Sequence, residues 1–303
     1  MASFPLKVIR GAFGLGERLA PTLTGWAAFE LFCRTASPRS LTGNERKAIA
    51  NAASFMSDAR HHHITTRRGC VRVHEFRPET GNARKGTVLV VHGWRSRTEY
   101  MRTVIEGLRA AGFRVMSLDL PGHGQSPGRK LDMARAVDAV AAADEWFGPF
   151  DAVVGHSFGG ATAVNAVAGS IAGIAPIAPG RLVLIAAPES LPKVFEQFGR
   201  IVNVGPKSQQ VIQRRVERIA GRPLSEFRGA EQLAQLSVPT LIIHAPDDRE
   251  VPAESARRYA SAGEHVRLHW AEGLGHRRIL ADAEVVDATV RFAAGAAALT
   301  PVH

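Results

Sequence analysis

Short apolar runs and amphipathic segments take turns along most of this chain, from residue 64 to the C-terminus. Residues 70–76 alternate around Val71 and Val73, whereas residues 86–91 form a continuous apolar run, which suits a strand that is covered on both faces. The same criteria predict strands at 70–76, 86–91, 114–118, 152–154, 182–186, 240–244 and 265–270, and helices at 98–111, 131–147, 158–168 and 282–298. Strands that alternate with helices indicate an α/β fold, with a mostly parallel central sheet and helices on both faces.

Two segments fall outside this alternation. Residues 1–63 carry a helical apolar pattern that is interrupted at Pro21 and Pro38 and resumes at 44–56. Residues 191–236 lie between two predicted strands and are helical, charged and rich in arginine, which is typical of a cap. We therefore expect an N-terminal helical extension at 1–63, a core at 64–190 and 237–303, and a helical cap at 191–236.

The composition is that of a soluble globular protein, with 45% hydrophobic and 22% charged residues. No apolar run reaches the ~18 residues of a membrane-spanning helix, and the charges near the N-terminus also argue against a signal peptide. These charges are Lys7, Arg10, Glu17, Arg18, Glu30 and Arg34. The chain has two cysteines, Cys33 and Cys70, too few for a disulfide framework, so we expect a cytoplasmic protein.

The formal net charge is +10, yet the basic residues are spread along the chain. They form no cluster interleaved with aromatic residues and no long basic tail, so we expect no nucleic-acid partner. A diffuse, solvated surface accounts for the charge. Attraction to anions, such as acidic lipid or substrate carboxylates, is the alternative.

The strongest chemical signal is the segment Gly155-His156-Ser157-Phe158-Gly159, which follows one predicted strand and opens a helix. Such a nucleophile elbow needs a strained backbone at the serine, and small residues on either side avoid collisions with neighbouring backbone. The serine also lies at a helix N-terminus, which favours the negative charge that develops during acyl transfer. Ser157 is therefore the predicted nucleophile.

A second segment, His92-Gly93-Trp94, directly follows the strand at 86–91, where this architecture places the loop that donates to an oxyanion. The backbone N–H groups of Trp94 and Phe158 are the predicted oxyanion donors. His92, Gly93 and His156 are expected to contribute to substrate binding. The alternative is that Gly93 merely ends a strand.

Serine needs a base within hydrogen-bond reach and a carboxylate that orients this base. His276, in a glycine-bearing loop beyond the last predicted strand, is the candidate base. Asp248 is the preferred acid because it stands three residues before Val251-Pro252, while Asp247, Glu250 and the more distant Glu189 remain alternatives. We interpret His61, His62, His63, His74 and His265 as surface histidines and expect neither a metal site nor a cofactor.

Together these motifs identify the part of the chain from about Cys70 onward as similar to the α/β-hydrolase superfamily, in particular to serine hydrolases such as bacterial carboxylesterases and lysophospholipases. The resemblance implies that residues 119–126 form a structural turn beside the site. A serine nucleophile sets the chain apart from haloalkane dehalogenases and dienelactone hydrolases, which use Asp and Cys. Ala245 departs from the glycine that relatives usually have. The matching motifs are His92-Gly93-Trp94, Asp119-Leu120-Pro121-Gly122-His123-Gly124, Gly155 to Gly159, Asp248-x-x-Val251-Pro252 and Gly275-His276.

The predicted reaction is hydrolysis of a carboxylic ester, or a related acyl bond, of a small hydrophobic substrate through an acyl-enzyme. Thioesterase, amidase, lactonase and acyltransferase activities use the same groups and stay open, as does a non-enzymatic ligand-binding role. Basic residues of the predicted cap, such as Lys193 and Arg200, make an anionic substrate a competing hypothesis. The N-terminal helix could contact a membrane peripherally, or pack against the core or between subunits. The oligomeric state is left open.

Overall fold

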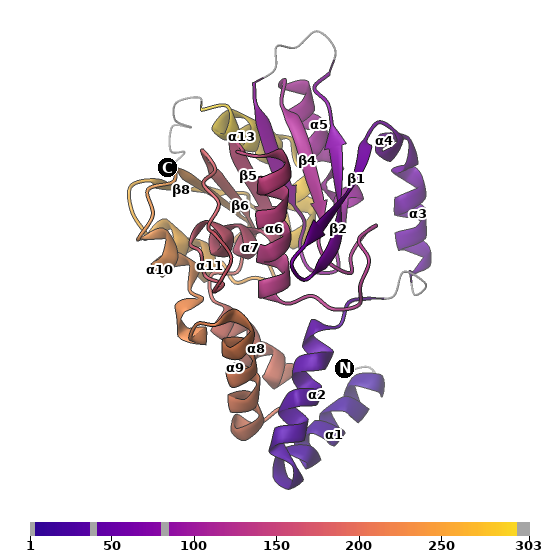
Figure 1. Cartoon of the computed structure of the whole chain (residues 1–303), viewed down its shortest axis with the longest axis vertical. Helices are drawn as coiled ribbons and strands as arrows, with labels where there is room; N and C mark the ends of the chain where they lie inside the picture. The colour runs from indigo at the N-terminus through magenta and orange to yellow at the C-terminus, as the bar shows by residue number, and fades with distance from the viewer. Residues whose placement is uncertain (1–3, 37–40, 80–84, 296–303) are drawn as a thin grey trace.

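A computed structural model of the chain describes residues 4–36, 41–79 and 85–295. Within these residues, eight strands form one sheet in the order β1-β2-β4-β3-β5-β6-β7-β8 (Figure 1). β1 and β4 each pair antiparallel with β2, and the other neighbouring strands are parallel. The predicted mostly parallel sheet is confirmed. Its strands are β1 Arg60–Thr66, β2 Gly69–Phe76, β3 Thr87–Val91, β4 Arg114–Asp119, β5 Ala152–His156, β6 Leu182–Ile185, β7 Thr240–His244 and β8 Val266–Trp270.

Helices cover both faces of the sheet because the central strands are apolar on both sides. Leu89 and Val91 of β3 point to one face and belong to a core with α6 (Met133–Phe147), α7 (Phe158–Val167) and α11 (Glu254–Ala260). Val88 and Val90 point to the other face and pack with α5 (Arg102–Ala110) and α13 (Ala283–Ala293). The period of two along each strand thus divides the core into two layers.

Short elements complete the fold around the sheet. A capping box between Thr42 and Glu45 begins α3, and α4 follows it directly, so that residues of α4 pack on the same layer as α5. The short elements are α3 Gly43–Asn51, α4 Ala53–Ser57, η2 Thr98–Met101, η3 Leu224–Glu226, α10 Gly229–Leu233, α12 Gly275–Arg278 and η4 Ile279–Ala281.

Four helices form a separate helical lobe at one end of the molecule (Figure 1). This lobe combines α1 (Phe4–Leu19) and α2 (Pro21–Cys33) with α8 (Leu191–Val202) and α9 (Pro206–Ala220). α2 lies so close to α9 that a Cβ atom at Gly25 would lie 2.6 Å from the carbonyl oxygen of Ser208. The Glu17 carboxylate accepts hydrogen bonds from the backbone N–H groups of Lys207 and Ser208, at 2.9 and 3.1 Å. The N-terminal helices are thereby attached to α9.

The structure differs from the sequence analysis at several boundaries. β1 begins at Arg60, so residues 60–63 belong to the sheet and not to the helical extension. They pair with β2, and the cross-strand contacts outweigh the weak local pattern of three histidines. The predicted helix at 44–56 is divided into α3 and α4. Residues 1–3 and 296–303 of the expected segments lie outside the described residues. None of the helices in the described ranges is both long and apolar enough to cross a membrane.

Candidate active site

Ser157 occupies the turn between β5 and α7, and its backbone is in an unusual conformation. Its φ is 52° and its ψ is −122°, a region that side chains other than glycine rarely occupy. The neighbouring glycines make the turn sterically feasible. A Cβ atom at Gly155 would lie 2.6 Å from the Gly159 carbonyl oxygen, and one at Gly159 would collide with the carbonyl oxygens of Val91 and His92. The strain predicted for the elbow is therefore present and is held by close packing.

One line of hydrogen bonds connects Ser157, His276 and Asp248. The Asp248 Oδ2 atom lies 2.7 Å from Nδ1 of His276 and, as a carboxylate oxygen, accepts the proton of that nitrogen. Nε2 of the neutral ring then accepts a hydrogen bond from the Ser157 hydroxyl, over 2.9 Å. Asp248 follows β7, and His276 lies in α12 after β8. Three residues that are far apart in sequence thus meet beyond the carboxyl ends of three parallel strands.

Asp248 is the acid that contacts His276 through Nδ1, and the other three candidates are placed differently. Asp247 accepts only a 3.3 Å hydrogen bond from the Gly275 N–H. Glu250 is bound to the Arg277 side chain, and its nearer oxygen lies 3.9 Å from Nε2 of His276. Glu189 lines the cavity beside Ser157. The structure thus brings Asp248, the acid preferred from the sequence, next to His276.

The environment of Asp248 keeps it ionised. Burial disfavours the charge, but hydrogen bonds from His276 and from the backbone N–H groups of Val251 and Glu250 outweigh it and hold the pKa below its ordinary value. The two backbone groups donate to Oδ1 at 2.9 and 2.7 Å. Nε2 of buried His244 donates to the Val251 carbonyl oxygen at 3.0 Å. This hydrogen bond stabilises the loop after β7 that carries Asp248. The loop thus orients both carboxylate oxygens.

Trp94 and Phe158, whose N–H groups are the predicted oxyanion donors, both line the cavity at Ser157. The N–H of Ser157 itself donates to the Ile185 carbonyl oxygen, whereas the N–H groups of Trp94 and Phe158 make no backbone hydrogen bond in the described part of the chain. Phe158 opens α7, where the first N–H groups of a helix lack intrahelical partners. Arg95, next to Trp94, has a φ of 53°, and its N–H donates to Nε2 of His123. The turn at residues 119–126 thereby supports the loop after β3 and contributes no residue to the cavity lining.

The sequence analysis expected His92 and His156 to contribute to substrate binding, but neither side chain lines the cavity. Nε2 of His92 accepts from the Leu120 N–H, and its Nδ1 donates to the Gly93 carbonyl oxygen, so both ring nitrogens are occupied inside the protein. Nε2 of His156 donates to the carbonyl oxygen of His276 at 2.9 Å. Burial lowers the pKa of His156 to about 3. Both histidines therefore stabilise backbone segments of the site through hydrogen bonds inside the protein.

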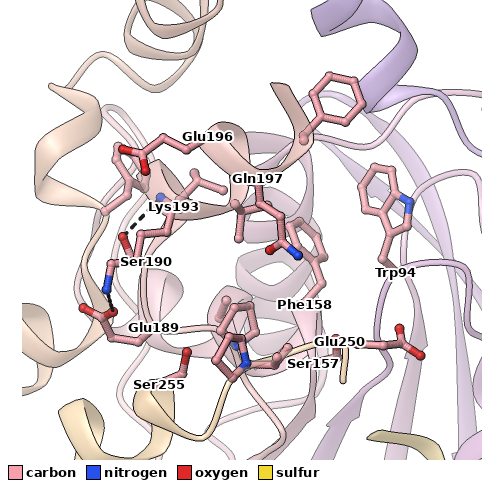
Figure 2. A pocket seen from close by; sticks show the side chains of 18 of the residues that line it. Trp94, Ser157, Phe158, Glu189, Ser190, Lys193, Glu196, Gln197, Glu250 and Ser255 are labelled. Carbon is pink, nitrogen blue, oxygen red and sulfur yellow. Dashed lines mark hydrogen bonds and ion pairs between the residues drawn. The ribbon is translucent and has the colours of Figure 1, made fainter. Parts of the chain in front are cut away.

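A cavity of about 850 Å³ extends from Ser157 and His276 toward the helical lobe. In Figure 2, Trp94 lies on one side of it and Glu189 with Ser190 on the opposite side, while Ser157 and Phe158 lie between them. A large part of the lining is apolar and comes from five different segments of the chain. These apolar residues include Leu31, Phe32, Trp94, Phe158, Leu191, Val194, Phe198, Ile201 and Phe227.

Leu31 and Phe32 of α2 are lining residues that the sequence analysis missed. The Phe32 ring lies 5.7 Å from Trp94, 4.6 Å from Phe195 and 5.1 Å from Phe198, measured between ring centroids. The available signal was that residues 21–33 are apolar around the whole helix, a pattern that indicates burial on more than one side. The N-terminal segment is thus part of the site.

Charges in the cavity wall are balanced. Four basic side chains, from Arg34, Arg95, Lys193 and Arg200, stand against four acidic ones, from Glu189, Glu196, Glu250 and Glu254. The remaining basic residues of the predicted cap do not line the cavity, namely Lys207, Arg214, Arg215, Arg218, Arg222 and Arg228. The excess positive charge of residues 191–236 therefore lies outside the cavity wall. In the described residues, no group of three or more His, Cys, Asp or Glu side chains is arranged to hold a metal ion.

Several known proteins are similar to this chain in sequence or in fold. A sequence model described as "Alpha/beta hydrolase family" matches residues 88–288. A non-heme haloperoxidase of Rhodococcus erythropolis is 29% identical over 244 residues, which are 66% of this chain and 89% of the relative. Est1E from Butyrivibrio proteoclasticus superposes with a TM-score of 0.60 at 16% identity, over 77% of this chain and 96% of the other. Naproxen esterase from Bacillus subtilis has a TM-score of 0.57 at 16% identity, over 84% and 99%. These two likenesses show the fold alone.

Proposed function

Because the chain belongs to the Alpha/beta hydrolase family, we propose that it is a serine hydrolase that cleaves a carboxylic ester of a small hydrophobic substrate through an acyl-enzyme. The observation that carries this proposal is the continuous hydrogen-bond line from Ser157 through His276 to Asp248, at 2.9 and 2.7 Å. Serine needs a base at that distance to become a nucleophile, and the base needs a carboxylate to hold its tautomer.

In the proposed first step, the Ser157 Oγ attacks the carbonyl carbon of the ester while its proton moves to Nε2 of His276. The oxygen of the carbonyl becomes negative and is held by the N–H groups of Trp94 and Phe158. Asp248 stabilises the positive imidazole ring that forms. His276 then gives its proton to the oxygen of the departing alcohol, which leaves the acyl group on Ser157.

In the proposed second step, water takes the place of the alcohol. His276 removes a proton from this water as it attacks the acyl carbonyl, and the proton returns to Ser157 when the acid is released. His92 and His156 act as positioning residues, because each holds backbone of the site and neither lines the cavity. Gly93 acts by leaving room, since a Cβ atom there would lie 2.9 Å from the Cβ of Ser157.

The cavity supports a hydrophobic acyl group as substrate. Its volume of about 850 Å³ lies within the range of roughly 300–1,000 Å³ of small-molecule sites, and aromatic side chains next to Ser157 contact what enters. The balance of four basic and four acidic side chains in its wall favours a neutral substrate over an anionic one. We propose that residues 191–236 form the cap of this site and that residues 64–190 and 237–303 form its core. The two unpaired cysteines support a cytoplasmic location.

The experiment that tests this proposal measures kcat/KM on p-nitrophenyl esters of increasing acyl length, for the wild type and for Ser157→Ala. We expect an optimum at one chain length and loss of turnover in the variant. Thioesters, amides and bromide with hydrogen peroxide are assayed in parallel, because relatives with this fold include a haloperoxidase. Higher kcat/KM on one of these substrates than on every ester would replace the ester assignment. Full activity of Ser157→Ala would contradict the serine mechanism.

A further inference from the structure

The helical lobe carries most of the strongly exposed large hydrophobic side chains in the described part of the chain. In the described ranges, seven large hydrophobic side chains are strongly exposed, and six of them lie on α1, α2 or α8. These six are Val8, Leu15, Leu19, Leu23, Trp26 and Ile201, and the seventh is Trp146 of α6. Such a concentration marks an interaction site, because monomeric proteins otherwise scatter their exposed apolar side chains.

The exposed residues of α1 form a continuous stripe. Leu6, Ile9 and Phe13 pack inward against the core, whereas Val8, Ala12, Leu15 and Leu19 are exposed at the spacing of one helical face. The α1 helix is therefore apolar on two opposite sides, and only one of them has a partner in the described structure. In the following helix α2, Leu23 is 72% exposed and Trp26 is 47% exposed.

Basic side chains outnumber acidic ones in the helical lobe. Lys7 and Arg18 are exposed on α1, and no exposed carboxylate belongs to the same face of that helix. Seven basic side chains of the lobe make no ion pair in the described part of the chain, namely Lys7, Arg10, Arg18, Arg200, Lys207, Arg214 and Arg218. The acids of the N-terminal helices are already engaged, Glu17 by backbone N–H groups of α9 and Glu30 by Lys130 and Arg215.

We propose that the outer face of α1 and α2, together with Ile201, docks on the surface of a membrane that contains anionic lipid. Apolar side chains flanked by unpaired Lys and Arg match the boundary between acyl chains and negative headgroups. A second copy of the chain fits less well, because a symmetric contact brings the same positive charges against each other. Ile201 of α8 is 48% exposed and also lines the cavity, so docking of the lobe would place one side of the cavity close to lipid.

The test is flotation of the full chain with phosphatidylcholine vesicles, with and without phosphatidylserine. We expect flotation only with the anionic vesicles, and a loss of binding as salt is raised. The variant Leu15→Glu/Leu19→Glu should reduce the partition coefficient at least about tenfold, because two leucines can no longer enter the interface. Trp146→Glu is the control outside the lobe, since it puts a negative charge on an exposed apolar position of α6 and should float like the wild type.

Circular dichroism of each variant establishes that it is folded. Flotation requires no turnover, so its outcome does not depend on whether the protein hydrolyses esters. Failure of the folded wild type to float with anionic vesicles overturns the proposal. Equal loss in Trp146→Glu and in Leu15→Glu/Leu19→Glu does so too. Light scattering without vesicles tests whether a second copy of the chain binds this surface instead. A wild-type dimer that becomes a monomer in Leu15→Glu/Leu19→Glu would assign the surface to a second copy.

Discussion

Replacing Asp248 with asparagine tests how the loop after β7 controls the tautomer of His276. Two backbone N–H groups, from Glu250 and Val251, donate to Oδ1, which leaves Oδ2 facing Nδ1 of the histidine. An asparagine in the same position must keep its oxygen toward those two donors, because an amide NH₂ group there would meet them as a third donor. Its NH₂ group is then directed at Nδ1 of His276.

This arrangement changes which nitrogen of His276 carries the proton. Facing a donor, Nδ1 becomes an acceptor and Nε2 becomes protonated, so the ring cannot accept the proton of Ser157 at 2.9 Å. We expect kcat to fall by about 10⁴-fold, which corresponds to about 5.4 kcal/mol of transition-state stabilisation, with a small change in KM. The loss should be somewhat smaller than in Ser157→Ala, and the double variant should add little because the residues act as a unit.

The assay is steady-state hydrolysis of the best p-nitrophenyl ester, with Asp247→Asn and Glu250→Gln as matched controls on the same loop. Asp247 makes only a long hydrogen bond to Gly275, and Glu250 binds Arg277, so these two variants should keep kcat within about threefold. If Asp248→Asn retains kcat within tenfold of the wild type, Asp248 does not control the tautomer of His276. The same follows if either control loses as much activity as Asp248→Asn.

Three further predictions follow from the site. The pKa of His156 is about 3 in the folded protein against an ordinary value of 6.5, so between these pH values only the unfolded chain binds the proton. The free energy of unfolding should therefore decrease as the pH is lowered through this range, by up to about 1.4 kcal/mol per pH unit. Thermal unfolding from pH 7 to 4 should show a shallower slope for His156→Gln, and an unchanged slope would contradict the assignment. Phe32→Ala should move the ester optimum to longer acyl chains and, because three aromatic contacts are lost, lower the unfolding free energy by about 2–3 kcal/mol. An unchanged optimum would remove α2 from the acyl site. Gly93→Ala should slow labelling of Ser157 by a fluorophosphonate, because the new Cβ would lie 2.9 Å from that of Ser157, and wild-type labelling would show that the loop moves freely.

The strands and the turn at Ser157 could be predicted from the sequence because their signals are local. The continuous apolar run at residues 87–91 reflects complete burial of β3 on both faces. The glycines around Ser157 reflect close contacts that recur wherever a strand turns sharply into a helix at such a residue. In both cases a few adjacent positions carry the whole physical requirement.

The rest of the site depends on contacts between distant segments. The apolar pattern of residues 21–33 indicates burial, but nothing near Leu31 and Phe32 indicates that α2 packs on α9, almost 200 residues away, or that it lines the cavity. The directions of His92 and His156 also have no local signature. Each stands next to a residue of the site, yet its ring points into the protein and bonds to Leu120 or to the backbone of His276.

The most direct test of the account is to trap the acyl-enzyme. The wild type is mixed with excess p-nitrophenyl ester and quenched in acid at early times, and the position of the added mass is mapped by peptide mass spectrometry. We predict one acyl group on Ser157, formed in a burst with one equivalent of nitrophenolate, and neither burst nor adduct in Ser157→Ala. An adduct on another residue, or wild-type turnover by Ser157→Ala, would contradict the claim that Ser157 is the nucleophile.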